Sequence, residues 1–169
     1  MARALVVYES IFGDARKIAE AVAEGLKGSH DVDVVAASEA PHEVDVDLLV
    51  VGGPNHGFSM PRESTREGAV KQYGAVVEDT KHGLHEWLDA VRLAQGTRAA
   101  AFDTRSDHPK LLIKMDHASK TEEKLLKGLG ATLVADAEHF YVTDATGPLV
   151  DGEEERASQW GRSLAGKVS

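Results

Sequence analysis

Residues 4–28 have the sequence ALVVYESIFGDARKIAEAVAEGLKG, and this stretch decides the fold class. Its first residues, Ala4 to Tyr8, are apolar and rich in β-formers, which predicts a buried strand. From Arg16 to Lys27 apolar residues recur at helical spacing, which predicts an amphipathic helix. Gly28 follows in the position favoured for a C-terminal cap. The stretch therefore predicts a strand, a tight loop and a helix.

The rest of the chain repeats this alternation. Further strands are predicted at 32–37, 47–53 and 98–103, with a last strand region at 132–135 and 140–143. Helices are predicted at 84–93, 111–129 and 153–164, and helix starts at the capping-box spacings Ser64-x-x-Glu67 and Ser119-x-x-Glu122. Repeated β-α-β order implies a parallel sheet with right-handed crossovers. We therefore predict an α/β fold in one domain, residues 1–169, with a doubly wound five-stranded parallel sheet and helices on both faces.

Composition limits the function classes. A formal net charge of -9 argues against a nucleic-acid partner, because neutralising phosphates requires a dense basic surface. The chain has no cysteine, which excludes disulfides, thiolate metal sites, cysteine nucleophiles and cysteine-ligated iron–sulfur clusters. The N-terminal residues lack the pattern of a signal peptide, and no apolar run has the length of a membrane span. We therefore expect a cytoplasmic protein with no membrane partner.

Ligands of doubly wound sheets bind outside the carboxyl ends of the strands, where the strand order reverses. Three predicted loops meet this description, at residues 9–15, 54–62 and 104–110. The first loop leads into a helix N-terminus, where backbone N–H groups and the helix dipole favour a phosphate. Gly13 in that loop would let the backbone approach such a ligand closely.

Two of these loops carry a family resemblance. Residues 7–13, VYESIFG, and 51–58, VGGPNHGF, resemble the flavodoxin family, and residues 101–105, AFDTR, extend the likeness to a bacterial flavodoxin-like FMN-binding subgroup. The C-terminal GPL at 147–149 and GEEERA at 152–157 also fit it. The resemblance implies that the first loop holds the FMN phosphate and the other two loops contact the isoalloxazine ring. The implied cofactor-binding residues are Ser10, Ile11, Phe12, Gly13, Asp14, Ala15, Pro54, Asn55, His56, Gly57, Phe58, Asp103, Thr104 and Arg105.

The phosphate loop departs from the family pattern. Asp14 and Ala15 stand where the family usually carries Asn or Ser followed by Thr, so a hydroxyl donor is missing. An ionised Asp14 repels a phosphate by about 1 kcal/mol or more at close range with surface-like screening. Asp14 is also interpreted as the N-cap of the first helix, where it would compete with phosphate for the same N–H donors. Both arguments predict weakened FMN binding.

Several side chains keep two interpretations. Phe58 either stacks on the ring or anchors its loop. Arg105 either stabilises negative charge on a reduced flavin, which would raise its potential, or is a surface arginine paired with Asp103 or Asp107. His82 and His85 could share a helix face, but no third metal ligand has a recognisable spacing.

Three functions remain open at this stage. The leading hypothesis is an FMN-binding electron-transfer protein with an unidentified redox partner, in which the flavin and not a side chain performs the redox step. The second is a flavodoxin-like module that has lost FMN and acts by protein–protein interaction, which Asp14 and Ala15 motivate. The third is an FMN-dependent NAD(P)H:quinone-type oxidoreductase, for which the sequence identifies no nicotinamide site.

Overall fold

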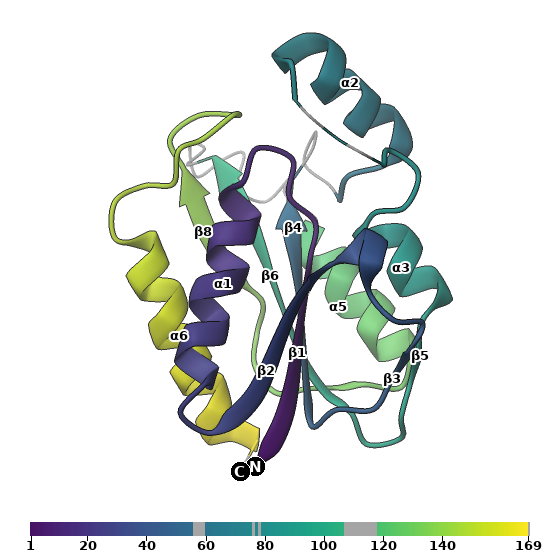
Figure 1. The fold of residues 1–169 in the computed structure, drawn as a ribbon, viewed down its shortest axis with the longest axis vertical. Helices are drawn as coiled ribbons and strands as arrows, with labels where there is room; N and C mark the ends of the chain where they lie inside the picture. The colour runs from purple at the N-terminus through teal and green to yellow at the C-terminus, as the bar shows by residue number, and fades with distance from the viewer. Residues whose placement is uncertain (56–59, 76, 78, 107–117, 169) are drawn as a thin grey trace.

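The computed structural model describes residues 1–55, 60–75, 77, 79–106 and 118–168. Its main sheet is parallel, with the order β2-β1-β4-β6-β7 and with β8 also paired to β6 (Figure 1). The strands are β1 (Ala2–Tyr8), β2 (His30–Ala36), β4 (Leu48–Pro54), β6 (Arg98–Ser106), β7 (Thr132–Leu133) and β8 (Glu138–Val142). The helices are α1 (Asp14–Leu26), α2 (Glu63–Tyr73), α3 (Leu84–Ala90), α5 (Ala118–Gly128) and α6 (Glu153–Val168).

The strand order reverses beside β1. The chain leaves β1 through α1 to reach β2 on one side, and then returns to place β4 on the other side. In this register Val6 of β1 lies between Val34 of β2 and Val50 of β4. The predicted doubly wound α/β fold is confirmed, and the reversal places a ligand site beyond the carboxyl ends of β1 and β4.

One strand prediction and one helix prediction need correction. The fifth position of the sheet is divided, because β7 and β8 pair with different segments of β6, so the sheet has six strands where five were predicted. In addition, the helix predicted over 84–93 ends at Ala90. Arg92–Leu93 then form the short strand β5, which pairs with β3 (Glu43–Val44) in a separate two-stranded sheet. In the chain, β3 follows the 3-10 turn Ala37–Glu39.

Each face of the main sheet has its own hydrophobic core. One face packs against α1 and α6 and buries Val6, Ile18 and Leu164. The other packs against α3 and α5 and buries Val7, Leu88 and Leu126. Successive β1 residues point to opposite faces, as the pleat of a strand requires. Figure 1 shows the four helices in these two layers, with α2 standing apart above the carboxyl ends of the strands.

The helices α1 and α6 pack at very short range. A Cβ on Gly25 would overlap the backbone of Ser158, and a Cβ on Gly161 would overlap the carbonyl oxygen of Val22. Glycine at both positions therefore lets the two helix backbones approach more closely than other residues would allow.

The outer strand β2 is an exposed edge. Asp31 and Asp33 are exposed on it and alternate with half-buried valines, and charged edge residues disfavour pairing with another sheet.

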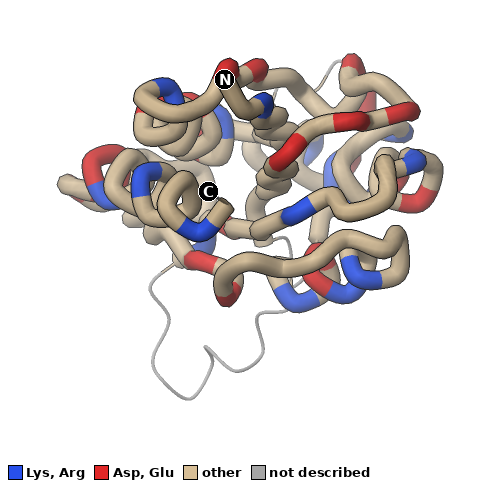
Figure 2. Tube along the Cα trace, turned by 90° about the horizontal axis from the view of Figure 1, so that it is seen from below, with Lys and Arg blue, Asp and Glu red and all other residues tan. Residues whose placement is uncertain are grey.

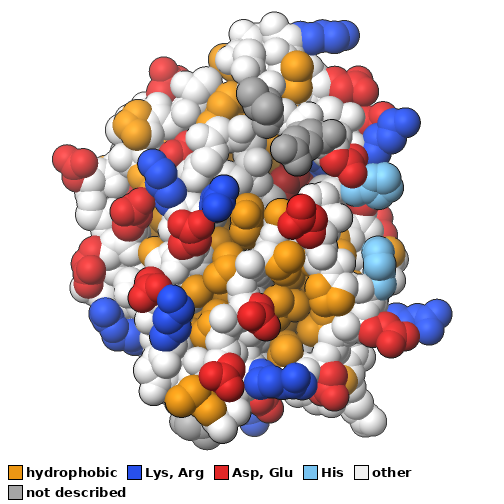
Figure 3. Space-filling model, in the orientation of Figure 1, with side chains coloured by type: hydrophobic (Ala, Val, Ile, Leu, Met, Phe, Trp, Pro, Cys, Tyr) orange, Lys and Arg blue, Asp and Glu red, His pale blue; other side chains and the backbone are white. Residues whose placement is uncertain are grey.

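The surface of the protein mixes apolar and charged side chains. On the face shown in Figure 3, apolar side chains are visible in the lower middle among acidic and basic ones. Seen from below, Lys and Arg are interspersed with Asp and Glu along the chain (Figure 2). Among the described residues, no helix combines the length and apolar character needed to cross a bilayer.

Candidate cofactor-binding site

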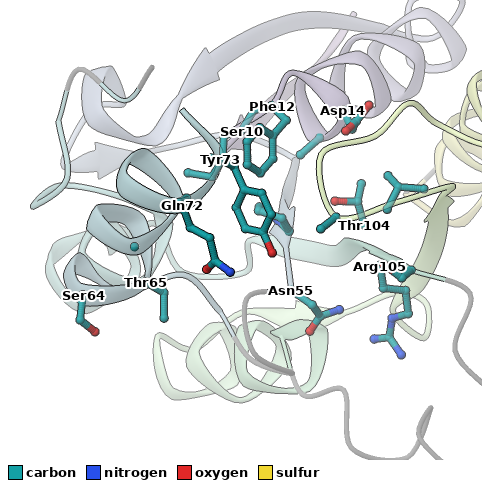
Figure 4. Close-up of a pocket in the computed structure, with 18 residues that line it drawn as sticks. Ser10, Phe12, Asp14, Asn55, Ser64, Thr65, Gln72, Tyr73, Thr104 and Arg105 are labelled. Carbon is teal, nitrogen blue, oxygen red and sulfur yellow. The ribbon is translucent and has the colours of Figure 1, made fainter. Parts of the chain in front are cut away.

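A cavity of about 550 Å³ opens at the carboxyl ends of the strands, between the loop after β1, the ends of β4 and β6, and helix α2 (Figure 4). Many of the residues predicted for the site line it. They are Ser10, Ile11, Phe12, Asp14, Ala15, Pro54, Asn55, Thr104 and Arg105.

Other predicted residues are placed differently. Gly13 borders a neighbouring hollow on the β2 side of the loop, and the side chain of Asp103 is completely buried below the cavity. His56, Gly57 and Phe58 lie outside the described residues, as does Asp107, one of the two partners considered for Arg105. The stacking interpretation of Phe58 therefore stays a prediction.

The first loop leaves the N-terminus of α1 without a side-chain cap. Gly13 is the N-cap residue, and its φ of 95° is left-handed. The Ser10 hydroxyl accepts a hydrogen bond from the Gly13 N–H at 3.1 Å, which holds the loop closed on itself. Because Gly13 has no side chain to cap the helix, it leaves the first-turn N–H groups of α1 without a cap, and the first helical residues Asp14 and Ala15 line the cavity. This arrangement suits an anion.

Asp14 is not the N-cap, contrary to the sequence-based interpretation. It is the first helical residue, because the left-handed Gly13 already makes the turn into the helix. Its carboxylate packs against the loop between β8 and α6, where a Cβ on Gly147 would lie 2.5 Å from Asp14 Oδ2. Burial raises the pKa of Asp14, and the positive charge of Lys17 partly opposes this. The carboxylate therefore does not compete with phosphate by capping, but it does place a partly buried charge at the rim.

Asn55 lines the cavity and has an unused side-chain donor. Its backbone N–H donates to the carbonyl of Thr104 at 3.0 Å, which joins the ends of β4 and β6. Its side-chain Oδ1 accepts from the Ala118 N–H at 3.0 Å, while its Nδ2 is buried and has no hydrogen-bond partner among the described residues. A buried amide without a partner is costly, so a ligand that accepts from Nδ2 is favoured here.

Arg105 is buried, which corrects the surface interpretation, although its pairing with Asp103 holds. Arg105 Nε donates to Asp103 Oδ1 at 2.9 Å, and Nη2 donates to Oδ2. Asp103 also accepts from the Ser119 N–H at 3.2 Å and lies 3.1 Å from His139 Nδ1. Burial tends to raise the pKa of Asp103, but hydrogen bonds from His139 and Arg105 outweigh it and hold the pKa below its usual value. A bidentate ion pair therefore lies at the edge of the cavity.

Sequence reasoning missed helix α2 as a wall of the site. It contributes Ser64, Thr65, Gly68, Ala69, Gln72 and Tyr73, and the opposite rim adds Ser106, Val142 and Ala145. Tyr73 meets Phe12 edge to face, with ring centroids 5.9 Å apart, and Gln72 and Tyr73 point into the cavity in Figure 4. The helix begins one residue before the predicted Ser64, and its N-cap is Arg62, whose N–H donates to Thr65 Oγ1 at 2.8 Å.

A buried ion-pair network holds α2 in place. Arg66 is completely buried and donates from Nε and Nη2 to both carboxylate oxygens of Glu9, at 2.8 and 3.0 Å. Its Nη2 also donates to Glu86 Oε1 at 2.7 Å, so β1, α2 and α3 meet at one guanidinium. Burial lowers the pKa of Arg66, but the hydrogen bonds that it donates to Glu9 and Glu86 outweigh it and raise the pKa. Separations of 57 and 20 residues left no local sequence signal for this network.

The histidines considered as metal ligands are separated. His82 precedes α3 and pairs with Asp79, whereas His85 lies on α3 and pairs with Asp89. Within the described ranges, no group of three or more His, Cys, Asp or Glu residues is arranged to hold a metal ion.

Comparison with known proteins identifies the fold. No protein-family model matches the sequence, and no curated protein sequence matches it. Among solved structures, the chain is similar to flavodoxin 1 from Bacillus cereus, with a TM-score of 0.67, 16% identity and coverage of 99% of this chain and 100% of that one. The chain has a flavodoxin-like fold.

Two further flavodoxins support this result. One from the domain Archaea has a TM-score of 0.66 and 17% identity, with 98% of both chains covered. The flavodoxin of Streptococcus pneumoniae has a TM-score of 0.63 and 17% identity, with 98% of this chain and 99% of that chain covered. The flavodoxin-like fold thus extends over nearly the whole chain, although few residues are identical.

Proposed function

We propose that this flavodoxin-like protein binds FMN in the cavity and carries electrons to or from a partner protein. The observation that carries the proposal is the N-terminus of α1, which its N-cap Gly13 leaves without a side-chain cap, beside a cavity lined by Asn55, whose Nδ2 has no hydrogen-bond partner among the described residues. FMN carries a phosphate at one end and a ring with hydrogen-bond acceptors at the other. The two features therefore fit its two ends.

Each end of the cofactor has its own set of residues in this proposal. Backbone N–H groups of residues 11, 12, 14 and 15 and the Ser10 hydroxyl hold the phosphate. Asn55 and Thr104 orient the polar edge of the ring, and Phe12 and Tyr73 give apolar contact area from the α2 side. His56, Gly57 and Phe58 are proposed to flank the ring, as the family resemblance implies. FMN, when bound, supplies the redox chemistry, while these residues set its affinity, exposure and potential.

Two features of the phosphate loop weaken the binding. Ala15 offers no hydroxyl, and the Asp14 carboxylate lies at the cavity rim. Repulsion between this carboxylate and a phosphate costs about 1 kcal/mol or more at close range. The site is therefore expected to bind FMN less tightly than the same loop with neutral side chains.

An FMN titration tests the proposal. Purified protein is added to FMN at low and at moderate salt, and the quenching of flavin fluorescence is followed. Saturable quenching is expected. Absence of quenching at high micromolar FMN would contradict FMN binding.

The partly buried Asp14 carboxylate favours a second candidate, a flavodoxin-like module without cofactor that acts through protein contacts. This candidate predicts no quenching even for the Asp14→Asn variant, because a module that has lost FMN will not regain it through one charge. The FMN proposal predicts tighter binding by that variant. An oxidoreductase role, a cytoplasmic location and a separate redox partner accompany the FMN proposal as further proposals.

A further inference from the structure

Glu122 is a completely buried carboxyl on α5. The residues one turn earlier bind the ends of two strands, since the Ala118 N–H donates to Asn55 Oδ1 and the Ser119 N–H donates to Asp103 Oδ2. Residues three apart on a helix lie on the same side, so Glu122 follows Ser119 along the face that meets β6. The hydrogen bonds to Asn55 and Asp103 thus attach the helix that carries Glu122 to β6 and to Asn55, a residue that lines the cavity.

Neither oxygen of the Glu122 carboxyl has a hydrogen-bond partner in the part of the chain that the structure describes. Ser119 Oγ and Asn55 Nδ2 are also buried without partners in the same region. An ionised carboxylate is strongly disfavoured where it is buried without a counter-ion or a hydrogen bond. A neutral carboxylic acid costs far less to bury, because it carries no net charge.

The charged groups around Glu122 act mainly in the same direction. Asp103 on β6, Glu9 after β1 and Glu123 on α5 each disfavour a second negative charge, and Arg105 on β6 opposes them. Arg105 already makes a bidentate ion pair with Asp103, which also lies beside His139. Arg66 pairs with both Glu9 and Glu86. Burial and the neighbouring carboxylates together raise the pKa of Glu122 well above its ordinary value of 4.5.

We propose that Glu122 holds a proton on α5 and thereby keeps a further negative charge away from the ion pair of Asp103 and Arg105. It acts as a positioning residue, because it acts on the cavity through its electrostatic interaction with Asp103 and Arg105, of which Arg105 lines the cavity. If FMN binds as proposed above, a neutral Glu122 makes reduction of the flavin easier than an ionised one would, since reduction adds negative charge nearby.

The first arm of the test needs no cofactor. Urea unfolding of the wild type, Glu122→Gln and Glu123→Gln is measured between about pH 4 and pH 8. Glu122 in the unfolded chain loses its proton near 4.5, whereas in the folded chain it keeps it. Rising pH therefore favours unfolding of the wild type relative to Glu122→Gln, by about tenfold per pH unit until the pKa of folded Glu122 is reached.

The half-buried Glu123 is the matched control, because Glu123→Gln removes a carboxyl from the same helix. It is expected to retain the pH dependence of the wild type. The proposal would be overturned if the ratio of the unfolding equilibrium constants of the wild type and Glu122→Gln stayed constant with pH. If Glu122→Gln does not fold, the carbon-13 shift of the Glu122 carboxyl in the wild type decides, since an ionised signal at neutral pH would overturn it.

The second arm rests on the proposed function. The midpoint potential of bound FMN is measured against pH in the wild type and in Glu122→Gln. The two potentials should agree at low pH, and the wild-type potential should fall below that of the variant once Glu122 ionises. Equal potentials at all pH values, with a proton titration seen in the first arm, would overturn the electrostatic role. Failure to bind FMN would contradict the proposed function and leave the first arm intact.

Discussion

Two helices border the cavity, and different forces attach them to the fold. Helix α1 buries Ile18, Val22 and Leu26 completely between the sheet and α6. Helix α2 buries only Arg66 and Ala69, and Arg66 is held by the carboxylates of Glu9 and Glu86. The phosphate side of the site therefore depends on apolar packing, whereas the α2 wall depends on charge. The α2 wall should open under conditions that leave the α1 side intact.

Removing the cation should have the largest effect on this comparison. Arg66→Met leaves Glu9 and Glu86 without their partner, and breaking a buried ion pair in this way costs about 3–5 kcal/mol. Part of this cost is avoided if α2 detaches, because water then reaches the two carboxylates. Amide hydrogen exchange is expected to show a greater loss of protection in α2 than in α1.

Arg62→Met is the control, because Arg62 is exposed and immediately precedes the same helix. Its stability should stay within about 0.5 kcal/mol of the wild type. Equal loss of protection in α1 and α2 of the Arg66 variant would show that the two walls are not independent.

A substitution on the apolar side should act on the whole fold. Gly161→Ala places a Cβ against the Val22 carbonyl and is expected to destabilise the protein by about 1–3 kcal/mol through overpacking. Gly166→Ala on the same helix meets no atom within 4 Å and should be neutral or stabilising by up to about 1 kcal/mol. Urea unfolding measures both. Two variants of equal stability would contradict the close approach of α1 and α6.

Changing the phosphate loop should alter ligand binding without touching α2. Asp14→Asn with Ala15→Thr is expected to bind FMN about five- to tenfold more tightly, because the repulsion of about 1 kcal/mol is removed and a hydroxyl is added. Unchanged affinity in a fluorescence titration would refute the repulsion argument.

The same position predicts a pH effect in the free protein. The pKa of folded Asp14 is raised above its ordinary value of 3.8, so the folded state prefers the neutral form. Asp14→Asn should therefore be more stable than the wild type above that pH, and the difference should disappear below it. A difference in unfolding free energy that persists in acid would assign the effect to packing.

Mild acid should separate the two walls with the smallest perturbation. Burial tends to raise the pKa of Glu86, but hydrogen bonds from Arg66 outweigh it and lower the pKa from 4.5. The stability from Glu86 is thus complete above 4.5 and is lost as pH falls through the lowered value. Exchange protection of α2 should decrease there before that of α1, and Glu86→Gln should reduce this pH dependence. Parallel loss in both helices would count against a charge-held wall.

The sequence predicted the layers of the fold because each buried strand and amphipathic helix has its own local period. The split fifth strand could not be foreseen, since the pairing of β7 and β8 with separate parts of β6 depends on nonlocal register. Helix α2 shows little amphipathic pattern because the residue it buries most deeply is an arginine. Its role in the site was therefore missed.

The site residues were predictable where they follow a strand. Ser10 and Asn55 follow β1 and β4, as the fold rule requires, whereas Thr104 and Arg105, predicted in a loop after the fourth strand, lie within β6 because the strand continues to Ser106. The role of Asp14 was wrong because capping depends on the backbone angles of Gly13, which are not encoded in the identity of Asp14. The burial of Arg105 was missed because its partner Asp103 is itself buried among Ser119 and His139, which are distant along the chain.

The central claim is that the uncapped end of α1 and the adjoining cavity bind FMN, and calorimetric titration of the wild type with FMN and with riboflavin tests it most directly. The two ligands differ only in the phosphate that α1 is proposed to hold. Binding of FMN about tenfold or more tightly than riboflavin is predicted, because a helix N-terminus stabilises an anion by up to ~2 kcal/mol. Equal affinities, or no binding of either ligand, would contradict the claim.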